Sequence, residues 1–209
     1  MLPFRFYLIT DRLSAGERAL SLLPELAQAG LCALQVREKD LSPAWLFHHC
    51  QDIQQALNQA PDHPVSLYLN DRADLALSLG FAGVHLREES LPLASHHTTL
   101  REALRFGVST HNLEGVKAAE AAGAQFATFG PVFPTASKTA YGDPVGLKAL
   151  EEAASRTRLP LLALGGVNPD NAGACLSAGA TGVAAISAIW EADDPLAELE
   201  AFARALGGL

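Results

Sequence analysis

Short apolar runs alternate along the whole chain with longer segments in which Leu and Ala recur at helical spacing. The short runs have the length and the β-branched or aromatic content of buried strands, and the longer segments have the period of amphipathic helices. This pattern predicts strands at 6–10, 32–36, 65–69, 83–86, 106–110, 126–129, 161–164 and 181–186. It predicts helices at 15–29, 42–60, 72–79, 112–122, 169–178 and 195–206, a weaker helix within 91–104, and a helix that begins near Gly146.

Eight strand–helix alternations indicate parallel strands covered by helices, which is the α/β class. Divided among eight units, the 209 residues give about 26 residues each, close to the minimum for a (β/α)8 barrel. A doubly wound open sheet would show the same alternation, but the count of eight and the absence of an early Gly-x-Gly-x-x-Gly motif favour the barrel. No linker divides the sequence, so we expect residues 1–209 to form a single TIM-barrel domain.

Composition narrows the class of protein further. Apolar residues make up 49% of the chain, and the net charge of −8 disfavours a nucleic-acid partner, because phosphate backbones require a basic surface. No run approaches the roughly 20 apolar residues that a membrane span needs, so no membrane partner is expected. Cys32, Cys50 and Cys175 are widely spaced, and the start of the sequence lacks the layout of a signal peptide. We therefore expect a reduced, cytoplasmic setting.

Polar residues and glycines gather directly after the predicted strands, at the end of a barrel where active sites form. They are Gln35, Arg37 and Lys39 after the second strand, Asn70 and Asp71 after the third, Ser109, Thr110 and His111 after the fifth, Thr135, Ser137 and Lys138 after the sixth, Gly165 and Gly166 after the seventh, and Ser187 after the eighth. Three cations, several hydroxyls and a carboxylate would therefore converge on one rim.

The connection after the strand at 126–129 is long and carries Thr135, Ser137 and Lys138, two hydroxyls and a cation of the kind that hold an oxyanion. Gly165-Gly166 lies where barrels often bind phosphate through backbone N–H groups. These features predict a site for a phosphorylated substrate.

A second, more highly charged phosphate group is predicted beside it. Arg37 can bond two phosphate oxygens at once, and Lys39 adds a point charge. Asp71 would face such a group only across a hard cation such as Mg²⁺. Each of these residues, considered individually, could instead form a salt bridge or a cap at the barrel rim. We favour that alternative for Gln35, Asn70 and Ser187 when each is considered by itself.

The same positions carry a resemblance that spans nearly the whole chain in collinear order. The segments are Tyr-Leu-Ile-Thr-Asp (7–11), Gln-Val-Arg-Glu-Lys (35–39), Asn-Asp-Arg-Ala-Asp-Leu-Ala (70–76), Gly-Val-His-Leu (83–86), Gly-Val-Ser-Thr-His-Asn (107–112), Phe-Gly-Pro-Val-Phe-Pro-Thr-Ala-Ser-Lys (129–138), Leu-Gly-Gly-Val (164–167) and Val-Ala-Ala-Ile-Ser-Ala-Ile (183–189). Together they resemble the thiamine phosphate synthase family, whose superfamily also contains the TenI-type thiazole tautomerases.

The resemblance implies a transferase that joins an aminopyrimidine methyl pyrophosphate to a thiazole phosphate and releases pyrophosphate. It implies that the pyrimidine ring stabilises a methylene cation, so that pyrophosphate departs first and the thiazole nitrogen then captures the carbon. The implied pyrophosphate ligands are Arg37, Lys39, Asn70, Ser109 and Lys138. The resemblance further assigns Asp71 to Mg²⁺, Gln35 to the pyrimidine, and the thiazole phosphate to Thr135, Ser137, Gly165, Gly166 and Ser187.

One segment departs from the family's pattern. Where the family has Gly-Val-His-Leu-Gly-Gln-Glu-Asp, this sequence has Ser90 in place of the aspartate that is the second metal ligand, and Arg87 in place of a glycine. Glu88 or Glu89 could supply a metal ligand instead, or Arg87 could take over the charge of the metal. If neither holds, synthase activity is weak or absent.

Three functions therefore remain open. Synthase is the first expectation, because the cations and the Thr-x-Ser-Lys loop are intact. A thiazole tautomerase, an isomerase, is the second, although Pro131 stands where the tautomerases have a catalytic histidine and leaves His111 as the nearby imidazole. A non-catalytic protein that binds thiamine-related ligands is the third. A homodimer is one assembly open to the chain.

Overall fold

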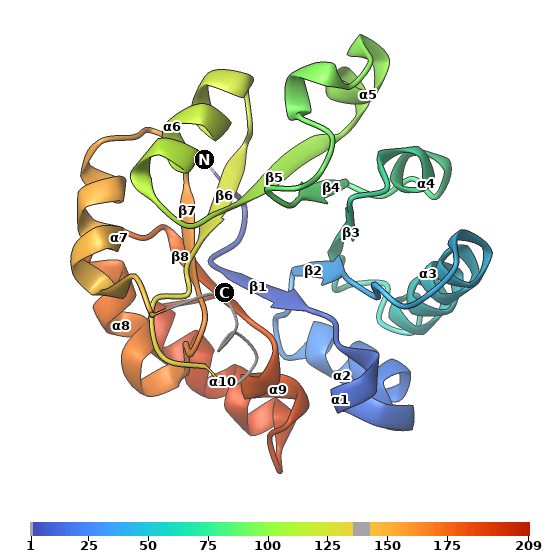
Figure 1. Cartoon of the computed structure of the whole chain (residues 1–209). Helices are drawn as coiled ribbons and strands as arrows, with labels where there is room; N and C mark the ends of the chain where they lie inside the picture. Colours follow the sequence, from blue (N-terminus) through green and yellow to red (C-terminus); the bar gives the residue numbers. More distant parts are fainter. Residues whose placement is uncertain (1, 136–142) are drawn as a thin grey trace.

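The computed structural model describes residues 2–135 and 143–209. Its centre is a closed barrel of parallel strands in sequential order, with β8 pairing back to β1 (Figure 1). The strands are β1 (Phe6–Ile9), β2 (Ala33–Val36), β3 (Ser66–Asn70), β4 (Gly83–Leu86), β5 (Arg105–Thr110), β6 (Phe126–Phe129), β7 (Leu161–Leu164) and β8 (Gly182–Ala185). This arrangement confirms the predicted α/β class and the (β/α)8 barrel.

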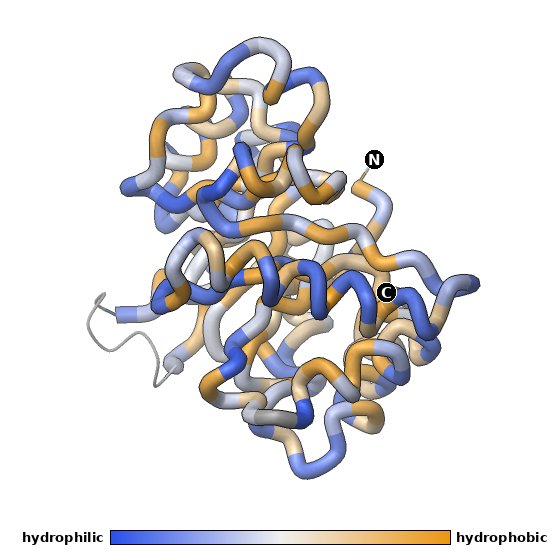
Figure 2. Tube along the Cα trace, turned by 90° about the vertical axis from the view of Figure 1, so that its right-hand side faces the viewer, coloured by the Kyte–Doolittle hydropathy of each residue, from blue (hydrophilic) through white to orange (hydrophobic). Residues whose placement is uncertain are grey.

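Helices surround the barrel on its outside (Figure 1). They are α1 (Arg12–Ala15), α2 (Ala19–Gln28), α3 (Pro43–Leu57), α4 (Ala73–Ser78), α5 (Thr98–Ala103), α6 (Leu113–Ala122), α7 (Gly146–Ser155), α8 (Pro169–Ser177), α9 (Ser187–Trp190) and α10 (Pro195–Leu206), with 3-10 helices η1 (Gly16–Arg18) and η2 (Leu93–Ser95). Hydrophilic and hydrophobic residues alternate along the helices in Figure 2, as expected for elements that bury one side.

Two helical predictions need correction. The segment predicted as one helix at 15–29 contains the last residue of α1, then η1 and α2, because Gly16 has a φ of 64°, outside the α-helical region. The short helix α9 was not predicted, since a single turn carries no readable period. The weaker helix within 91–104 corresponds to η2 and α5.

Local capping chemistry explains where several helices begin and end. Ser42 caps α3 by accepting a hydrogen bond from the Trp45 backbone N–H, and Pro43 occupies the first turn. Gly123 ends α6 in the left-handed conformation that glycine adopts without a Cβ penalty. These residues were readable as stop and start signals in the sequence, so the strands that follow them lie where expected.

Aromatic side chains fill the amino-terminal end of the barrel interior. The ring centroids of Tyr7 and Phe126 lie 5.4 Å apart, and those of Phe4 and Phe126 lie 5.6 Å apart. Tyr68 packs edge-on against Tyr7 at 5.5 Å. These rings therefore close the barrel interior at its amino-terminal end, and polar groups can collect only toward the carboxyl ends of the strands.

Within the part of the chain described, no helix has the length and hydropathy needed to cross a bilayer.

Candidate active site

A chain of hydrogen bonds joins three of the predicted site residues across β2 and β3. The Gln35 side-chain amide donates to Asn70 Oδ1 at 3.2 Å, and Asn70 Nδ2 donates to Asp71 Oδ2 at 3.0 Å. Gln35 is buried, while Asn70 and Asp71 are half-buried at the end of β3. The parallel register that pairs β2 with β3 brings these side chains together at the carboxyl end of the barrel.

The backbone of Asp71 is in an unusual conformation. Its φ is 62°, in the left-handed region that costs a non-glycine residue about 1–2 kcal/mol, although Asp tolerates it better than most. Its N–H donates to the carbonyl of His85 at 3.0 Å, which pins the turn to β4. Conformations of this kind persist where tertiary contacts hold them, and they cluster at functional sites.

The Asp71 carboxylate is engaged by the loop that follows β4. Arg87 Nε donates to Asp71 Oδ2 at 2.5 Å, and the Ser90 hydroxyl donates to Asp71 Oδ1. The same Ser90 oxygen accepts the backbone N–H of Arg87 at 2.7 Å, which closes a compact turn. The two residues that depart from the family's pattern therefore bind the one carboxylate that the sequence assigned to a metal.

Lys39 lies within electrostatic reach of two other cations, Arg37 and Arg87, and of the Asp71 carboxylate. Partial burial lowers the pKa of Lys39, and the positive charges of Arg37 and Arg87 lower it further. The carboxylates of Asp71 and Glu89 act on Lys39 in the opposite direction. Arg37 and Lys39, predicted as anion ligands, thus share one electropositive region with Arg87.

A buried network that the sequence did not reveal holds the segment carrying Arg37 and Lys39. The Thr10 hydroxyl accepts the Arg37 backbone N–H at 2.9 Å and donates to Glu38 Oε1 at 2.6 Å. Burial raises the pKa of Glu38, while the hydrogen bonds from Thr10 and from the Arg12 backbone lower it. Strand alternation could have signalled this network, because it turns Glu38 away from Arg37 and Lys39, toward the end of β1.

Ser109, another predicted ligand, is bonded to a buried histidine. His85 Nε2 lies 3.1 Å from Ser109 Oγ, and His85 Nδ1 lies 3.5 Å from the Tyr7 hydroxyl. Burial lowers the pKa of His85 to about 3, so its ring is neutral at neutral pH. A tyrosine hydroxyl can donate to Nδ1, which leaves Nε2–H to donate to Ser109. His85 therefore helps to position Ser109 at the rim.

Thr135, Gly166 and Ser187 lie together on the other side of the rim. They line an open cavity of about 710 Å³, and they share with Gly165 a smaller one of about 50 Å³. Carboxylates, among them Glu191, also line the larger cavity, whereas none of the described residues around the smaller one is charged. A phosphate group would therefore meet less repulsion in the smaller cavity.

The loops after β6 and β7 are joined backbone to backbone beside this cavity. Phe133 N–H donates to the Gly165 carbonyl at 2.9 Å. Gly165 and Gly166 have φ values of 96° and 62°, and a Cβ on Gly165 would lie 2.5 Å from Pro131 Cβ. Glycine is required here because a side chain would separate the two loops.

Three sequence predictions near this loop have different outcomes. Ser137 and Lys138 lie outside the described residues. His111 Nδ1 lies within hydrogen-bonding reach of the Gly130 carbonyl, where it can only donate, so Nε2 is the ring nitrogen left for exchange with a ligand.

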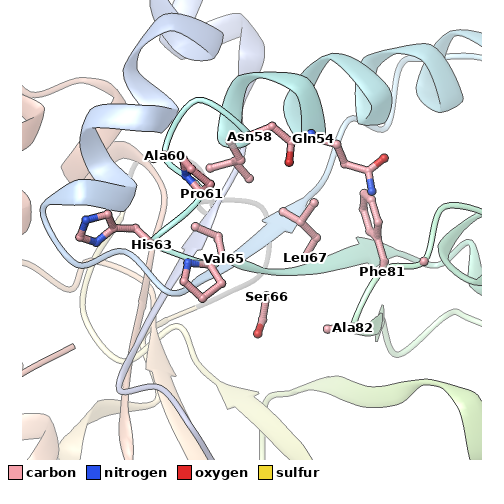
Figure 3. A pocket seen from close by; sticks show the side chains of 13 residues that line it. Gln54, Asn58, Ala60, Pro61, His63, Val65, Ser66, Leu67, Phe81 and Ala82 are labelled. Atoms are coloured by element: carbon pink, nitrogen blue, oxygen red, sulfur yellow. The ribbon is translucent and has the colours of Figure 1, made fainter.

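A separate cavity of about 630 Å³ lies at the opposite end of the barrel (Figure 3). It is lined by the end of α3 and by residues at the amino ends of β3 and β4, including Ser66 and Ala82. None of the described residues that line it is an acid, a lysine or an arginine, and His63 is the sole titratable group among them. The chemistry expected of a phosphate site is therefore at the carboxyl end.

Comparison with known proteins agrees with this geometry. The family model described as thiamine monophosphate synthase matches residues 6–189. The chain belongs to this family. A relative from Geobacter sulfurreducens, named "Putative thiamine-phosphate synthase", is 45% identical over 92% of this chain and 89% of its own. The thiamine-phosphate synthase of Roseiflexus sp. is 40% identical over 96% of this chain and 82% of its own.

Solved structures of other proteins also have this fold. The thiamine phosphate pyrophosphorylase of Pyrococcus furiosus superposes with a TM-score of 0.83 at 29% identity, covering 97% of this chain and 95% of that one. A 3-hexulose-6-phosphate synthase superposes with a TM-score of 0.71 at 17% identity, covering 97% of this chain and 100% of that one, and so shares the fold alone.

Proposed function

We propose that this protein is a thiamine-phosphate synthase, a transferase that joins an aminopyrimidine methyl pyrophosphate to a thiazole phosphate. The observation that carries the proposal is the convergence of Arg37, Lys39 and Arg87 on the Gln35–Asn70–Asp71 network, in a chain of the thiamine monophosphate synthase family. Small phosphorylated substrates suit this rim, because its cations can neutralise phosphate oxygens.

In this reaction the protein binds and aligns the two substrates and does not react with them covalently. The bond between the pyrimidine methylene carbon and the pyrophosphate oxygen breaks, and its electron pair leaves with pyrophosphate. The thiazole nitrogen then donates its lone pair to the same carbon, which forms thiamine phosphate. No protein nucleophile takes part, so the rate depends on neutralising the leaving group and holding the two substrates in line.

We assign the pyrophosphate to the side of the rim formed by β2–β5. Arg37 and Lys39 contribute charge, and Asn70 and Ser109 contribute hydrogen bonds. Asn70 Oδ1 already accepts from Gln35, and Ser109 is bonded to neutral His85, so both side chains are held before substrate arrives. Gln35, at the barrel interior, would meet the pyrimidine ring. Lys138 completes the cation set by its position in the sequence.

We assign the thiazole phosphate to the smaller, uncharged cavity. Gly165 and Gly166 present backbone N–H groups that no Cβ shields, and the hydroxyls of Thr135 and Ser187 flank them. Ser137, in the loop after β6, is the remaining assigned contact. Segregating the two phosphates on opposite parts of the rim would leave the reacting atoms between them.

The resemblance implies Mg²⁺ with Asp71 as its ligand, and the residues present do not fit that ion well. Asp71 accepts hydrogen bonds from Asn70, Arg87 and Ser90, and the guanidinium of Arg87 would repel a divalent cation. Among the described residues, no group of three or more His, Cys, Asp or Glu side chains could hold a metal ion. Asp71 is therefore already engaged by groups that compete with a divalent cation.

The test is formation of thiamine phosphate by purified protein given both substrates. Product should appear, and Arg37→Ala should reduce kcat/KM by about 100-fold, because a charge-assisted contact to the leaving group is lost. Absence of product at high enzyme concentration, with and without Mg²⁺, would remove the assignment. Tautomerisation of a thiazole carboxylate phosphate in that case would favour the isomerase.

We also propose a location, a domain organisation and an assembly for this protein. A cytoplasmic location is favoured by the cysteines, which are all unpaired in the structure. Residues 1–209 are expected to act as one domain, and a homodimer remains an expected assembly. Gel filtration with light scattering would test the last of these.

A further inference from the structure

We propose that the guanidinium of Arg87, held in place by Asp71 and Ser90, takes the place of a divalent cation beside the pyrophosphate. The protein would then bind pyrophosphate, and release it from the substrate, without Mg²⁺. This inference rests on the proposed synthase function, because it assigns the charge that stabilises the leaving group at that same site.

Ser90 supports this arrangement through two hydrogen bonds of opposite sense. Its hydroxyl donates to Asp71 Oδ1 and its oxygen accepts the Arg87 backbone N–H at 2.7 Å. A hydroxyl can do both, whereas an ionised carboxylate at position 90 could only accept. An aspartate there would stand against the Asp71 carboxylate and would need a cation between the two. Serine instead ties Asp71 to the loop that carries Arg87.

Arg87 is placed so that its charge remains available to a ligand. Its Nε bonds Asp71 at 2.5 Å and its Nη1 lies 3.4 Å from Glu89. The side chain is 36% exposed, and Nη2 has no partner among the described residues. A guanidinium stays charged at any physiological pH and can bond two phosphate oxygens.

The acidic residues beside Arg87 offer no alternative metal site. Glu89 is paired with Arg87 and is 79% exposed, and Glu88 is exposed as well. Asp71 is the remaining carboxylate, and Arg87 occupies one of its oxygens. Mg²⁺ requires near-octahedral oxygen coordination, which a single carboxylate already paired with a cation does not prepare.

Calorimetric titration with inorganic pyrophosphate tests the proposal apart from turnover. We expect wild-type protein in excess chelator to bind pyrophosphate, and Arg87→Ala to weaken that binding by about tenfold or more. Arg87→Lys should recover part of the affinity, because it retains the charge but loses the planar fork.

Arg72→Ala is the matched control. Arg72 is 34% exposed and bonds Asp74 at 2.6 Å, so the arginine itself resembles Arg87 in exposure and in the length of its ion pair, although Asp74 is more exposed than Asp71. Its loss should change pyrophosphate affinity by less than about twofold, because a surface ion pair alone contributes little. Circular dichroism and thermal unfolding of each variant would show that the barrel is intact.

A reciprocal variant restores the family's pattern at both positions. Arg87→Gly combined with Ser90→Asp removes the guanidinium and places a second carboxylate beside Asp71. Titration with Mn²⁺, followed by the electron paramagnetic resonance signal of the free ion, should show binding by this double variant and none by wild type at the same concentration.

The outcomes separate the inference from the proposed function. Pyrophosphate binding that requires Mg²⁺, or that is unchanged in Arg87→Ala, would overturn the role of Arg87 and leave the synthase assignment standing. Mn²⁺ binding by wild type would overturn it as well. A wild type that binds pyrophosphate neither with nor without Mg²⁺ would overturn both, because the site would then not be a pyrophosphate site.

Discussion

The buried histidine beneath the site makes a quantitative prediction about stability and pH. His85 is 1% exposed, and burial lowers its pKa to about 3; the Asp71 charge opposes this shift and the Arg37 charge adds to it. In the unfolded chain its pKa is near 6.5. Below pH 6.5 the unfolded state therefore binds a proton that the folded state does not, so His85 makes the protein less stable as the pH falls toward 3.

The size of the effect follows from the interval between the two pKa values. Each pH unit below 6.5 costs about 1.4 kcal/mol, so at pH 5 the loss attributable to His85 is about 2 kcal/mol. Glu38 affects the pH dependence of stability in the opposite direction. Its pKa is raised in the folded state, so it contributes stability at low pH that is lost as the pH rises. A difference between variants is therefore required to isolate His85.

Urea unfolding of wild type and His85→Gln at pH 5 and pH 7.5 provides that difference. Glutamine retains polar atoms but does not titrate, so wild type should lose about 2 kcal/mol more than the variant on going to pH 5. His63→Gln, at an exposed position, should behave as wild type does. Equal losses in wild type and His85→Gln, or an imidazole NMR titration of His85 near pH 6.5, would show that burial does not lower the pKa of His85 in the folded protein.

Three further changes test other parts of the site. Lys138→Ala should raise the activation free energy of turnover by about 2–4 kcal/mol, with little effect on thiazole phosphate binding. A raised KM at unchanged kcat would instead show that Lys138 stabilises the bound substrate and the transition state equally. Gly166→Ala should raise the KM for thiazole phosphate and cost at least about 1–2 kcal/mol in urea unfolding, because φ is 62° and the new Cβ would lie 2.8 Å from Phe133 Cβ. An unchanged KM would count against the phosphate assignment. Thr10→Val should destabilise the protein by about 2 kcal/mol and lower kcat/KM, since Glu38 and the Arg37 N–H lose a shared partner. Parallel kinetics and unfolding of the isosteric variant would check this, and unchanged kinetics would show that the network does not position Arg37.

The barrel was predictable because its strands are short apolar runs closed by local signals. β4, β6 and β7 have the predicted bounds, and Gly123 and Ser42 mark helix ends by capping chemistry that needs no tertiary information. Gly16 was overlooked as a break within a helical pattern, although it is the C-cap of α1 and its backbone N–H donates to the Arg12 carbonyl.

The sequence predicted that Gln35, Asn70 and Asp71 lie close together, but it did not predict their contacts. Position after a strand was enough to gather Gln35, Asn70 and Asp71, because parallel strands end together. The pairing of Asp71 with Arg87 depends on the backbone turn at Asp71 and on the loop after β4, neither of which a linear pattern determines. The sequence therefore left open whether Arg87 or an acidic neighbour serves at this position.

The most direct measurement is a single-turnover reaction with both substrates in excess chelator, quenched rapidly and assayed for thiamine phosphate and pyrophosphate. Both products should form in equal amounts, at a rate that added Mg²⁺ changes by less than about threefold. Product formation only when Mg²⁺ is added would contradict the role given to Arg87. Failure to form thiamine phosphate under either condition would contradict both the synthase function and the role given to Arg87.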